Sequence, residues 1–154
     1  MKKVVIIVLV ICAPLFVVVG LICYRFSHDA ITRISGRKFD SKLLQEVASS
    51  TKIYFPAGSR GLDYYGEAGF RDSAFAAKIS IPKEGRTEFL QNEIFHAGKN
   101  TVPYIQTGKK EKWWRLPELE HRVDRMVEFP RAIVECSFGD EESTSVAYIT
   151  WWHH

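Results

Sequence analysis

The feature that most constrains this 154-residue chain is a run of twenty residues without a charge, from Val4 to Cys23. An α-helix rises about 1.5 Å per residue, so a helix over this run would be about 30 Å long, which matches the hydrocarbon core of a bilayer. We therefore expect a transmembrane helix over residues 4–23, preceded by a short tail of residues 1–3. The lipid bilayer would then be the first partner of the chain, and everything after residue 23 would be the cargo of a membrane anchor.

Three fates are open for this segment: a cleaved signal peptide, a lipoprotein signal or a retained signal-anchor. Cleavage needs small residues just before the cut, and the nearest candidates are Val18 and Gly20, but the apolar run continues past them. Lipidation needs a small residue before the modified cysteine, whereas Cys12 and Cys23 both follow isoleucine. The signal-anchor therefore fits best.

The orientation of the anchor depends on two opposing signals. Two lysines precede the run, and four basic residues lie within about fifteen positions after it, a bias that favours a cytoplasmic domain. The Met-Lys-Lys opening is instead typical of a chain that keeps its N-terminus inside and exports the residues after the apolar run. We expect a single-pass protein of the bacterial inner membrane with its C-terminal domain on the periplasmic, extracytoplasmic side.

The composition of residues 24–154 allows one domain with its own core. The whole chain has 21 basic and 18 acidic residues, and without the two lysines of the N-terminal tail the charges almost balance. This balance gives no electrostatic reason to expect a nucleic-acid partner. Only Cys136 lies outside the apolar run, so the domain contains no internal disulfide.

Hydrophobic periodicity predicts a juxtamembrane linker over residues 24–40 and an α+β globular domain over residues 41–154. The fold class expected for the domain is an antiparallel sheet of about four or five strands with one main packed helix. The last strand is apolar on both faces, which predicts either a central strand that is covered on both sides or a strand with one face reserved for a partner. The individual elements that we expect are helices over 41–48, 84–95 and 118–125, and strands over 52–55, 62–65, 75–81, 131–138 and 144–152.

No catalytic, cofactor or metal site is recognisable in the sequence. Phosphate-binding glycine motifs are missing from the sequence, and His96 and His121 have no partner at zinc-ligand spacing. Cys136 falls on the apolar face of its strand, which indicates a buried structural thiol. The acidic residues at 140–142 lie in the predicted hairpin loop, where we expect them to be solvated. We therefore predict a non-enzymatic protein without cofactors.

Aromatic side chains are the best candidates for a binding surface. Trp114 and Trp151 are expected to belong to the core, because tryptophan in a small domain usually packs inside. The remaining candidates could form an exposed platform for a sugar ring or a partner's pocket, and they are Tyr64, Tyr65, Trp113 and Trp152.

Several short motifs succeed one another along the second half of the chain. They are Ile79-Ser-Ile-Pro82, Phe89-Leu90, Trp113-Trp114 and Tyr148-Ile149. Together with the N-terminal anchor, this order resembles small uncharacterised bacterial envelope proteins. The resemblance covers about half of the chain and implies no activity.

These features together favour a membrane-tethered binding or accessory domain of the cell envelope. Tethering raises the local concentration of a weak binder, so modest contacts can suffice. Its partner would be another envelope protein, and an immunity-type inhibitor of an exported toxin belongs to this class. The alternative is a glycan or cell-wall binding module that uses the aromatic platform, and a hydrolase has the least support.

Overall fold

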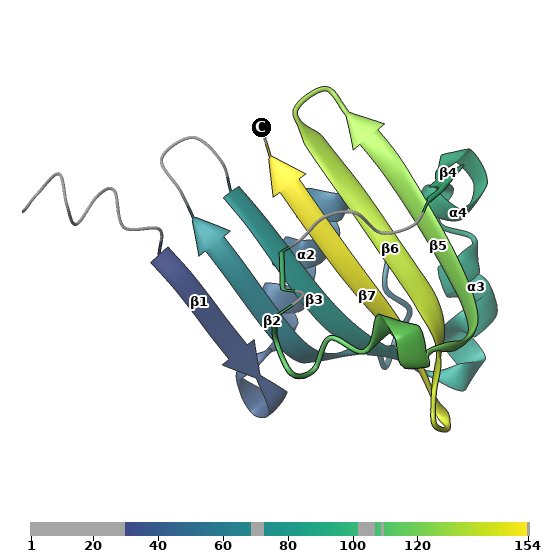
Figure 1. The fold of residues 1–154 in the computed structure, drawn as a ribbon. Coiled ribbons are helices and arrows are strands. Elements are labelled where there is room, and N and C mark those ends of the chain that lie inside the picture. The colour runs from purple at the N-terminus through teal and green to yellow at the C-terminus, as the bar shows by residue number, and fades with distance from the viewer. Residues whose placement is uncertain (1–29, 69–72, 102–106, 109, 154) are drawn as a thin grey trace, which may run out of the picture.

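The structure is a computed structural model that describes residues 30–68, 73–101, 107–108 and 110–153 (Figure 1). Its described residues form one antiparallel sheet with short helices. The strands are β1 (Ala30–Ser35), β2 (Arg60–Ala68), β3 (Ser73–Ile81), β4 (Lys99–Asn100), β5 (Glu120–Phe129), β6 (Ala132–Glu141) and β7 (Thr144–His153). The α-helices are α2 (Ser41–Thr51), α3 (Arg86–Leu90) and α4 (Glu93–Ala97), and the 3-10 helices are η1 (Gly36–Lys38), η2 (Lys83–Gly85) and η3 (Leu116–Glu118).

The strand order is β1-β2-β3-β7-β6-β5-β4, and every pair of neighbours is antiparallel. Two meanders, β1-β2-β3 and β5-β6-β7, therefore meet where β3 pairs with β7. The register of this central pair runs from Ser73 opposite His153 to Ile81 opposite Ser145. Because β7 is flanked by β3 and β6, the prediction of a central position for the last strand is confirmed.

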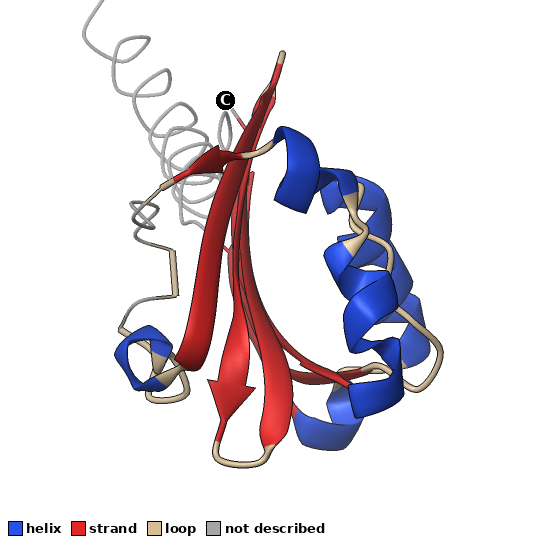
Figure 2. Ribbon diagram, turned by 90° about the vertical axis from the view of Figure 1, so that its right-hand side faces the viewer, coloured by secondary structure: helices blue, strands red, loops and turns tan. Residues whose placement is uncertain are grey.

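The helices α2, α3 and α4 cover one face of the sheet, and the segment around η3 lies against the other face (Figure 2). Along β3, Phe75, Ala77, Ile79 and Ile81 point to the helices and are buried. Their neighbours on β6 and β7 continue this apolar layer, which includes Val134, Cys136, Phe138, Ala147 and Ile149. Cys136 is thus a buried core residue, as its place in the strand pattern predicted.

The second face of the sheet is more polar, although much of it is also buried. A small apolar cluster forms where Leu116 and Leu119 pack on Val146 and Tyr148. Next to it, Lys78, Glu135, Ser137 and Thr150 are all less than a tenth exposed. Gly108 packs so closely on the sheet that a Cβ atom at this position would lie only 2.6 Å from the Cβ atom of Ala76. Both faces of the central strands are therefore shielded from solvent.

The predicted fold class is wrong in its strand count and helix content. The structure has a seven-stranded antiparallel sheet, not four or five strands, and short helices in place of one main packed helix. Within the described residues no helix is long and apolar enough to cross a membrane. The transmembrane helix predicted over residues 4–23 lies outside the described residues.

Three strands, β1, β4 and β5, are not predicted by the sequence patterns, and β4 has only two residues. β1 lies within the predicted linker, where an edge strand with one partner does not need a clean apolar face. β5 includes residues 118–125 in part, which were predicted to form a helix. Its helix-facing residues are Val123, Arg125, Val127 and Phe129, and they alternate with Asp124, Met126 and Glu128. The period of two was hidden because Arg125 lies on one face and Met126 on the other.

The predicted helix over 84–95 consists of η2, α3 and α4, and the break between α3 and α4 lies at Asn92, which leaves the helical conformation. Its side-chain amide accepts a hydrogen bond from Tyr54 N at 2.6 Å and donates to Tyr54 O and Phe89 O. Asparagine often competes with the helix in this way. The same bonds hold residues 53–55 as a loop, so the short strand predicted at 52–55 is also wrong.

The helix predicted from residue 41 and the strand predicted at 75–81 are confirmed as α2 and β3. The N-cap of α2 is Asp40, since Asp40 Oδ1 accepts a hydrogen bond from Leu43 N at 2.9 Å. The C-terminal hairpin is also confirmed, but its strands extend to Glu141 and Thr144 and leave only a two-residue turn.

The core under the helices depends on Phe89, which is fully buried and contacts the rings of Phe55, Phe95 and Phe138. We expect Phe89→Ala to lower the free energy of unfolding by about 3–5 kcal/mol, because it leaves a large cavity. Urea denaturation of the full chain in detergent, followed by near-UV circular dichroism, measures this loss. The matched control is Tyr54→Ala, since Tyr54 is 57% exposed and should cost little; equal losses for both variants would contradict this assignment of the core.

Candidate functional site

The four aromatic residues predicted to form a binding platform lie on two faces of the sheet. Tyr64 faces the helices, where its ring stacks on Phe75 at 5.6 Å and meets the edge of Phe39 at 6.0 Å. Tyr65 is the next residue along β2 and faces the other way, buried, with its hydroxyl donating to Glu67 at 2.5 Å. The sheet thus separates Tyr64 from the other candidates.

Trp113 and Trp152 are both half-buried on the second face. The ring of Trp113 stacks on Tyr148 at 6.3 Å and meets Trp114 edge-on at 5.5 Å. Trp152 pairs across the sheet with Ala74 and Ile133. These contacts use the ring of Trp113 for packing, so the structure does not assemble the four residues into one exposed platform.

The acidic end of the C-terminal hairpin forms an ion-pair cluster and not a solvated loop. Arg86 Nη1 lies 2.5 Å from Asp140 Oδ1, and Ser145 Oγ donates to the same oxygen at 2.8 Å. The guanidinium of Arg86 also lies 5.1 Å above the ring centroid of Phe138. The expectation of solvated side chains is therefore wrong for Asp140, and it holds for Glu142, which is exposed. The cluster attaches α3 to the hairpin.

The same cluster contains a serine, an aspartate and a histidine, but their order does not suit nucleophilic catalysis. A serine hydrolase places the histidine between the hydroxyl and the carboxylate, so that the ring can take the hydroxyl proton. Here Asp140 lies in the middle, with Ser145 Oγ on Oδ1 and His121 Nδ1 at 3.4 Å from Oδ2. Ser145 consequently has a carboxylate and not an imidazole beside its hydroxyl in this cluster.

A second ion-pair cluster lies on the other face around Lys78. Its Nζ atom is 2.5 Å from Glu141 Oε2 and 5.3 Å from the ring centroid of Tyr148. Burial lowers the pKa of Lys78, but hydrogen bonds to Glu141 and Tyr148 outweigh this and raise it overall. Burial also raises the pKa of Asp63, the cross-strand partner of Lys78. A lysine that stays protonated cannot act as a neutral amine nucleophile.

The remaining candidates for chemistry are also engaged in structure. Cys136 is completely buried, and burial raises the pKa of its thiol far above the ordinary value, so the thiolate that would react is not formed. Among the residues that the structure describes, no group of three or more His, Cys, Asp or Glu side chains could hold a metal ion.

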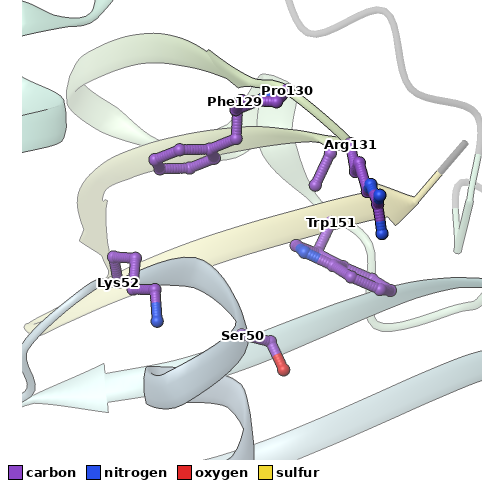
Figure 3. Close-up of a pocket in the computed structure, with 7 residues that line it drawn as sticks. Ser50, Lys52, Phe129, Pro130, Arg131 and Trp151 are labelled. Carbon is purple, nitrogen blue, oxygen red and sulfur yellow. The ribbon is translucent and has the colours of Figure 1, made fainter.

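A groove with open space lies at the end of α2, and we call it the Trp151 groove (Figure 3). Its volume is about 360 Å³, within the range of about 300–1,000 Å³ that is typical of ligand pockets. It is lined by Ser50, Lys52, Phe129, Pro130, Arg131, Ala132 and Trp151.

One wall of the Trp151 groove is the C-terminal end of α2. The helix stops because Lys52 adopts a left-handed conformation, with φ 61° and ψ 22°, and its N–H donates to Ala48 O at 2.9 Å. Thr51 Oγ1 donates to Val47 O at 2.8 Å and strengthens this end. Ser50 and Lys52 are exposed and border the open space.

The opposite wall is the turn between β5 and β6, where Phe129 and Ala132 are paired across Pro130 and Arg131. The floor is Trp151 of β7, which is half-buried and stacks on Phe75 at 5.3 Å and on His153 at 5.7 Å. These contacts fix the indole on the sheet. The groove thus has a rigid apolar floor between two rigid elements.

Two cations and no acidic side chain line the Trp151 groove. Lys52 and Arg131 lie on opposite sides of the Trp151 indole (Figure 3), and neither forms an ion pair with another described residue. Glu46, which lies one turn earlier in α2, does not line the groove. Its charge acts on Tyr64 instead: burial raises the pKa of Tyr64, and the negative charge of Glu46 raises it further. The groove therefore combines apolar surface with unbalanced positive charge.

The Trp151 groove is not predicted by any sequence pattern. Trp151 was expected to be a core residue, and it does pack on the core, but one part of it remains open. Lys52 and Arg131 lie far apart in the chain, and no local pattern connects them. The Ser-Ser-Thr-Lys end of the helix and the Phe-Pro-Arg turn are the only signals, and they mark chain reversals rather than a site.

Comparison of the chain with protein-family models, curated proteins and solved structures finds no match. The resemblance to small envelope proteins therefore stays a prediction. The motifs that carry it lie at the end of β3, in α3, in the segment before η3 and on β7. All four contribute to the packing on one face of the sheet or the other.

The Asp140 cluster predicts a specific dependence of stability on pH. Burial raises the pKa of Asp140, but hydrogen bonds from Ser145 and Arg86 and the charge of Arg86 lower it below the ordinary value. The ionised carboxylate therefore stabilises the fold above about pH 4, and this contribution is lost as the pH falls through the lowered pKa.

We expect Asp140→Asn to lower the free energy of unfolding by about 1–3 kcal/mol at pH 7, because Arg86 and Ser145 lose a charged acceptor. The difference from wild type should shrink between about pH 4 and pH 2 in urea titrations. Glu142→Gln is the control, since the loss of this exposed carboxylate should change neither the free energy of unfolding at pH 7 nor its dependence on pH. A difference for Asp140→Asn that is independent of pH would contradict the assignment.

Proposed function

We propose that this chain is a non-enzymatic binding domain of the bacterial cell envelope that engages a protein partner through the Trp151 groove. The observation that carries the proposal is the groove itself: an apolar floor with two cations that no described side chain neutralises. Apolar clefts with a few polar groups are the usual form of a binding site.

The proposal of a binding role is supported by how the reactive side chains are used. Ser145 and Asp140 bind Arg86, Lys78 binds Glu141, and Cys136 lies in the core. Each of these contacts stabilises the packing of one element on another. None of them places a histidine between a hydroxyl or thiol and a carboxylate.

A protein partner is favoured over a glycan by the surroundings of the tryptophans. A sugar ring stacks on an open aromatic face. The indole of Trp151 stacks on Phe75 and on His153, and the ring of Trp113 stacks on Tyr148. Among the described residues, the exposed large hydrophobic side chains are Ile31 and Tyr54, which lie on separate elements. A side chain of a partner protein can instead enter the groove beside the indole.

The domain is proposed to lie at the membrane because residues 4–23 form an uncharged apolar run. This uncharged run remains the reason to expect attachment to the inner membrane, and the Met-Lys-Lys opening is the reason to expect the domain on the periplasmic side. Attachment would keep the Trp151 groove at a high effective concentration near envelope partners. An immunity-type inhibitor that meets an imported toxin at the membrane is one role of this kind.

Photocrosslinking in native cells tests the binding role. A photoreactive amino acid at position 50 lies on the rim of the Trp151 groove, and the control position 83 comes after β3 at the opposite end of the sheet. We expect a discrete protein adduct from position 50 and not from position 83, and we expect Arg131→Glu to remove it. Adducts to cell-wall glycan alone, or equal protein adducts from both positions, would contradict the proposal.

Membrane attachment is tested by substitutions within residues 4–23. We expect the wild-type chain to stay with membranes after an alkaline carbonate wash. Val10→Lys combined with Val17→Lys should release it, because each charge costs about 2.5–3.5 kcal/mol at the centre of a spanning helix. The paired alanine substitutions are the control and should leave the chain in the pellet. Release of the wild-type chain would contradict attachment while leaving the groove unaffected.

A further inference from the structure

The arrangement of charges around the Trp151 groove carries information about the ligand. Lys52 belongs to the end of α2 and Arg131 to the turn between β5 and β6, so two separate elements bring cations to one apolar space. Lys52 alone would need no ligand, because a cation at a helix C-terminus is favoured by the helix dipole. Arg131 has no such role, and it shares the groove with Lys52.

The two cations lie on opposite sides of the indole (Figure 3). A single phosphate group would be best held by cations that converge on one point. Cations on either side of an apolar floor are instead suited to two separate carboxylates with an apolar group between them. An acidic peptide with one large apolar side chain has this form.

We propose that the Trp151 groove binds an acidic segment of the partner protein, with an aromatic or aliphatic side chain in the groove and flanking carboxylates paired with Lys52 and Arg131. This inference rests on the proposed binding function and names the chemistry of the partner. The floor provided by Trp151 and Phe129 supplies apolar contact, and the rim supplies orientation. Complementary charge of this kind mainly sets specificity and the rate of association.

A truncated tryptophan would be a poor test, because Trp151 also packs on the core. Lys52→Gly is a better variant. The left-handed conformation at position 52 favours glycine, so this substitution should keep or raise the melting temperature while it removes the cation. Lost binding with retained stability then separates a ligand contact from a folding effect.

The experiment uses the full chain in nanodiscs of zwitterionic lipid. The probe is a fluorescent five-residue peptide, capped at both ends, with a central phenylalanine between aspartates and glutamates. One comparison peptide carries asparagine and glutamine in place of the acids, and another carries glycine in place of phenylalanine. Fluorescence anisotropy gives the Kd, and the indole N–H signal of Trp151 in an NMR titration reports whether the peptide lies in the groove.

We expect the acidic phenylalanine peptide to bind about tenfold more tightly than either comparison peptide and to shift the Trp151 signal. Lys52→Gly and Arg131→Gln should each weaken binding about three- to fivefold, as expected for exposed ion pairs. Lys83→Gln, an exposed cation at the other end of the sheet, should change nothing. High salt should reduce the difference between the peptides.

Three outcomes would overturn the inference. The first is equal affinity for the acidic and the amide peptides, and the second is binding that leaves the Trp151 signal unmoved. The third is a shift of that signal in nanodiscs of anionic lipid without peptide, removed by Arg131→Gln, which would identify a lipid headgroup as the occupant. If the peptide does not bind but position 50 still gives a protein crosslink, the proposal of an acidic segment is overturned and the proposed binding function is not. If the peptide does not bind and the crosslink is also missing, the proposed binding function is overturned as well.

Discussion

The pairing of β3 with β7 is the interaction on which the rest of this molecule depends. It joins two antiparallel meanders that are far apart in the chain, and it gives one continuous sheet in place of two small ones. Three strands with a covered apolar face are about the least that a sheet needs to be stable alone, so each meander by itself would be at this limit. Because the central strands are covered on both faces, their apolar residues and their polar residues are both removed from water. The two ion-pair clusters and the Trp151 groove are consequences of this arrangement.

On each face of the sheet, a carboxylate near the turn of the C-terminal hairpin forms an ion pair with a cation. Asp140 points to the helices and binds Arg86, while its neighbour Glu141 points to the other face and binds Lys78. Adjacent strand residues alternate between faces, so one short acidic sequence holds Arg86 of α3 on one side and Lys78 of β3 on the other. An unpaired lysine at the position of Lys78 would be costly to bury, which explains why its carboxylate partner lies so close to it. Charge is used here to fix packing, and little of it remains for catalysis.

The parts of the fold that could be predicted from the sequence are those whose pattern is local. The period of α2, the alternation in β3 and the apolar hairpin of β6 and β7 each appear within about ten residues, which is the length of a single element. The division of the predicted helix over 84–95 was not recognisable, because Asn92 departs from the helix to bind the backbone of Tyr54, a contact 38 residues away. β5 was misread for a related reason: the contact of Arg122 with Asp124, two residues apart on one face of a strand, forms only when the chain is extended, and a helix would place the two side chains on different faces. The Trp151 groove has no local pattern at all, since Lys52 and Arg131 come to one place only when the sheet and α2 have formed.

The position of the Trp151 groove results from a mismatch of lengths between the two layers. β7 has ten residues and spans about 33 Å, whereas the eleven residues of α2 span about 16 Å. A helix of this length cannot cover a strand from end to end, so an apolar strand end beyond Lys52 is left open. Other small proteins could cover such an end with a longer helix or a loop. Here the helix stops at a lysine in the left-handed conformation, and the facing turn supplies an arginine, so the uncovered apolar surface is bordered by charge. An apolar surface that is left open and given two cations is better explained by a ligand than by the packing of the domain itself.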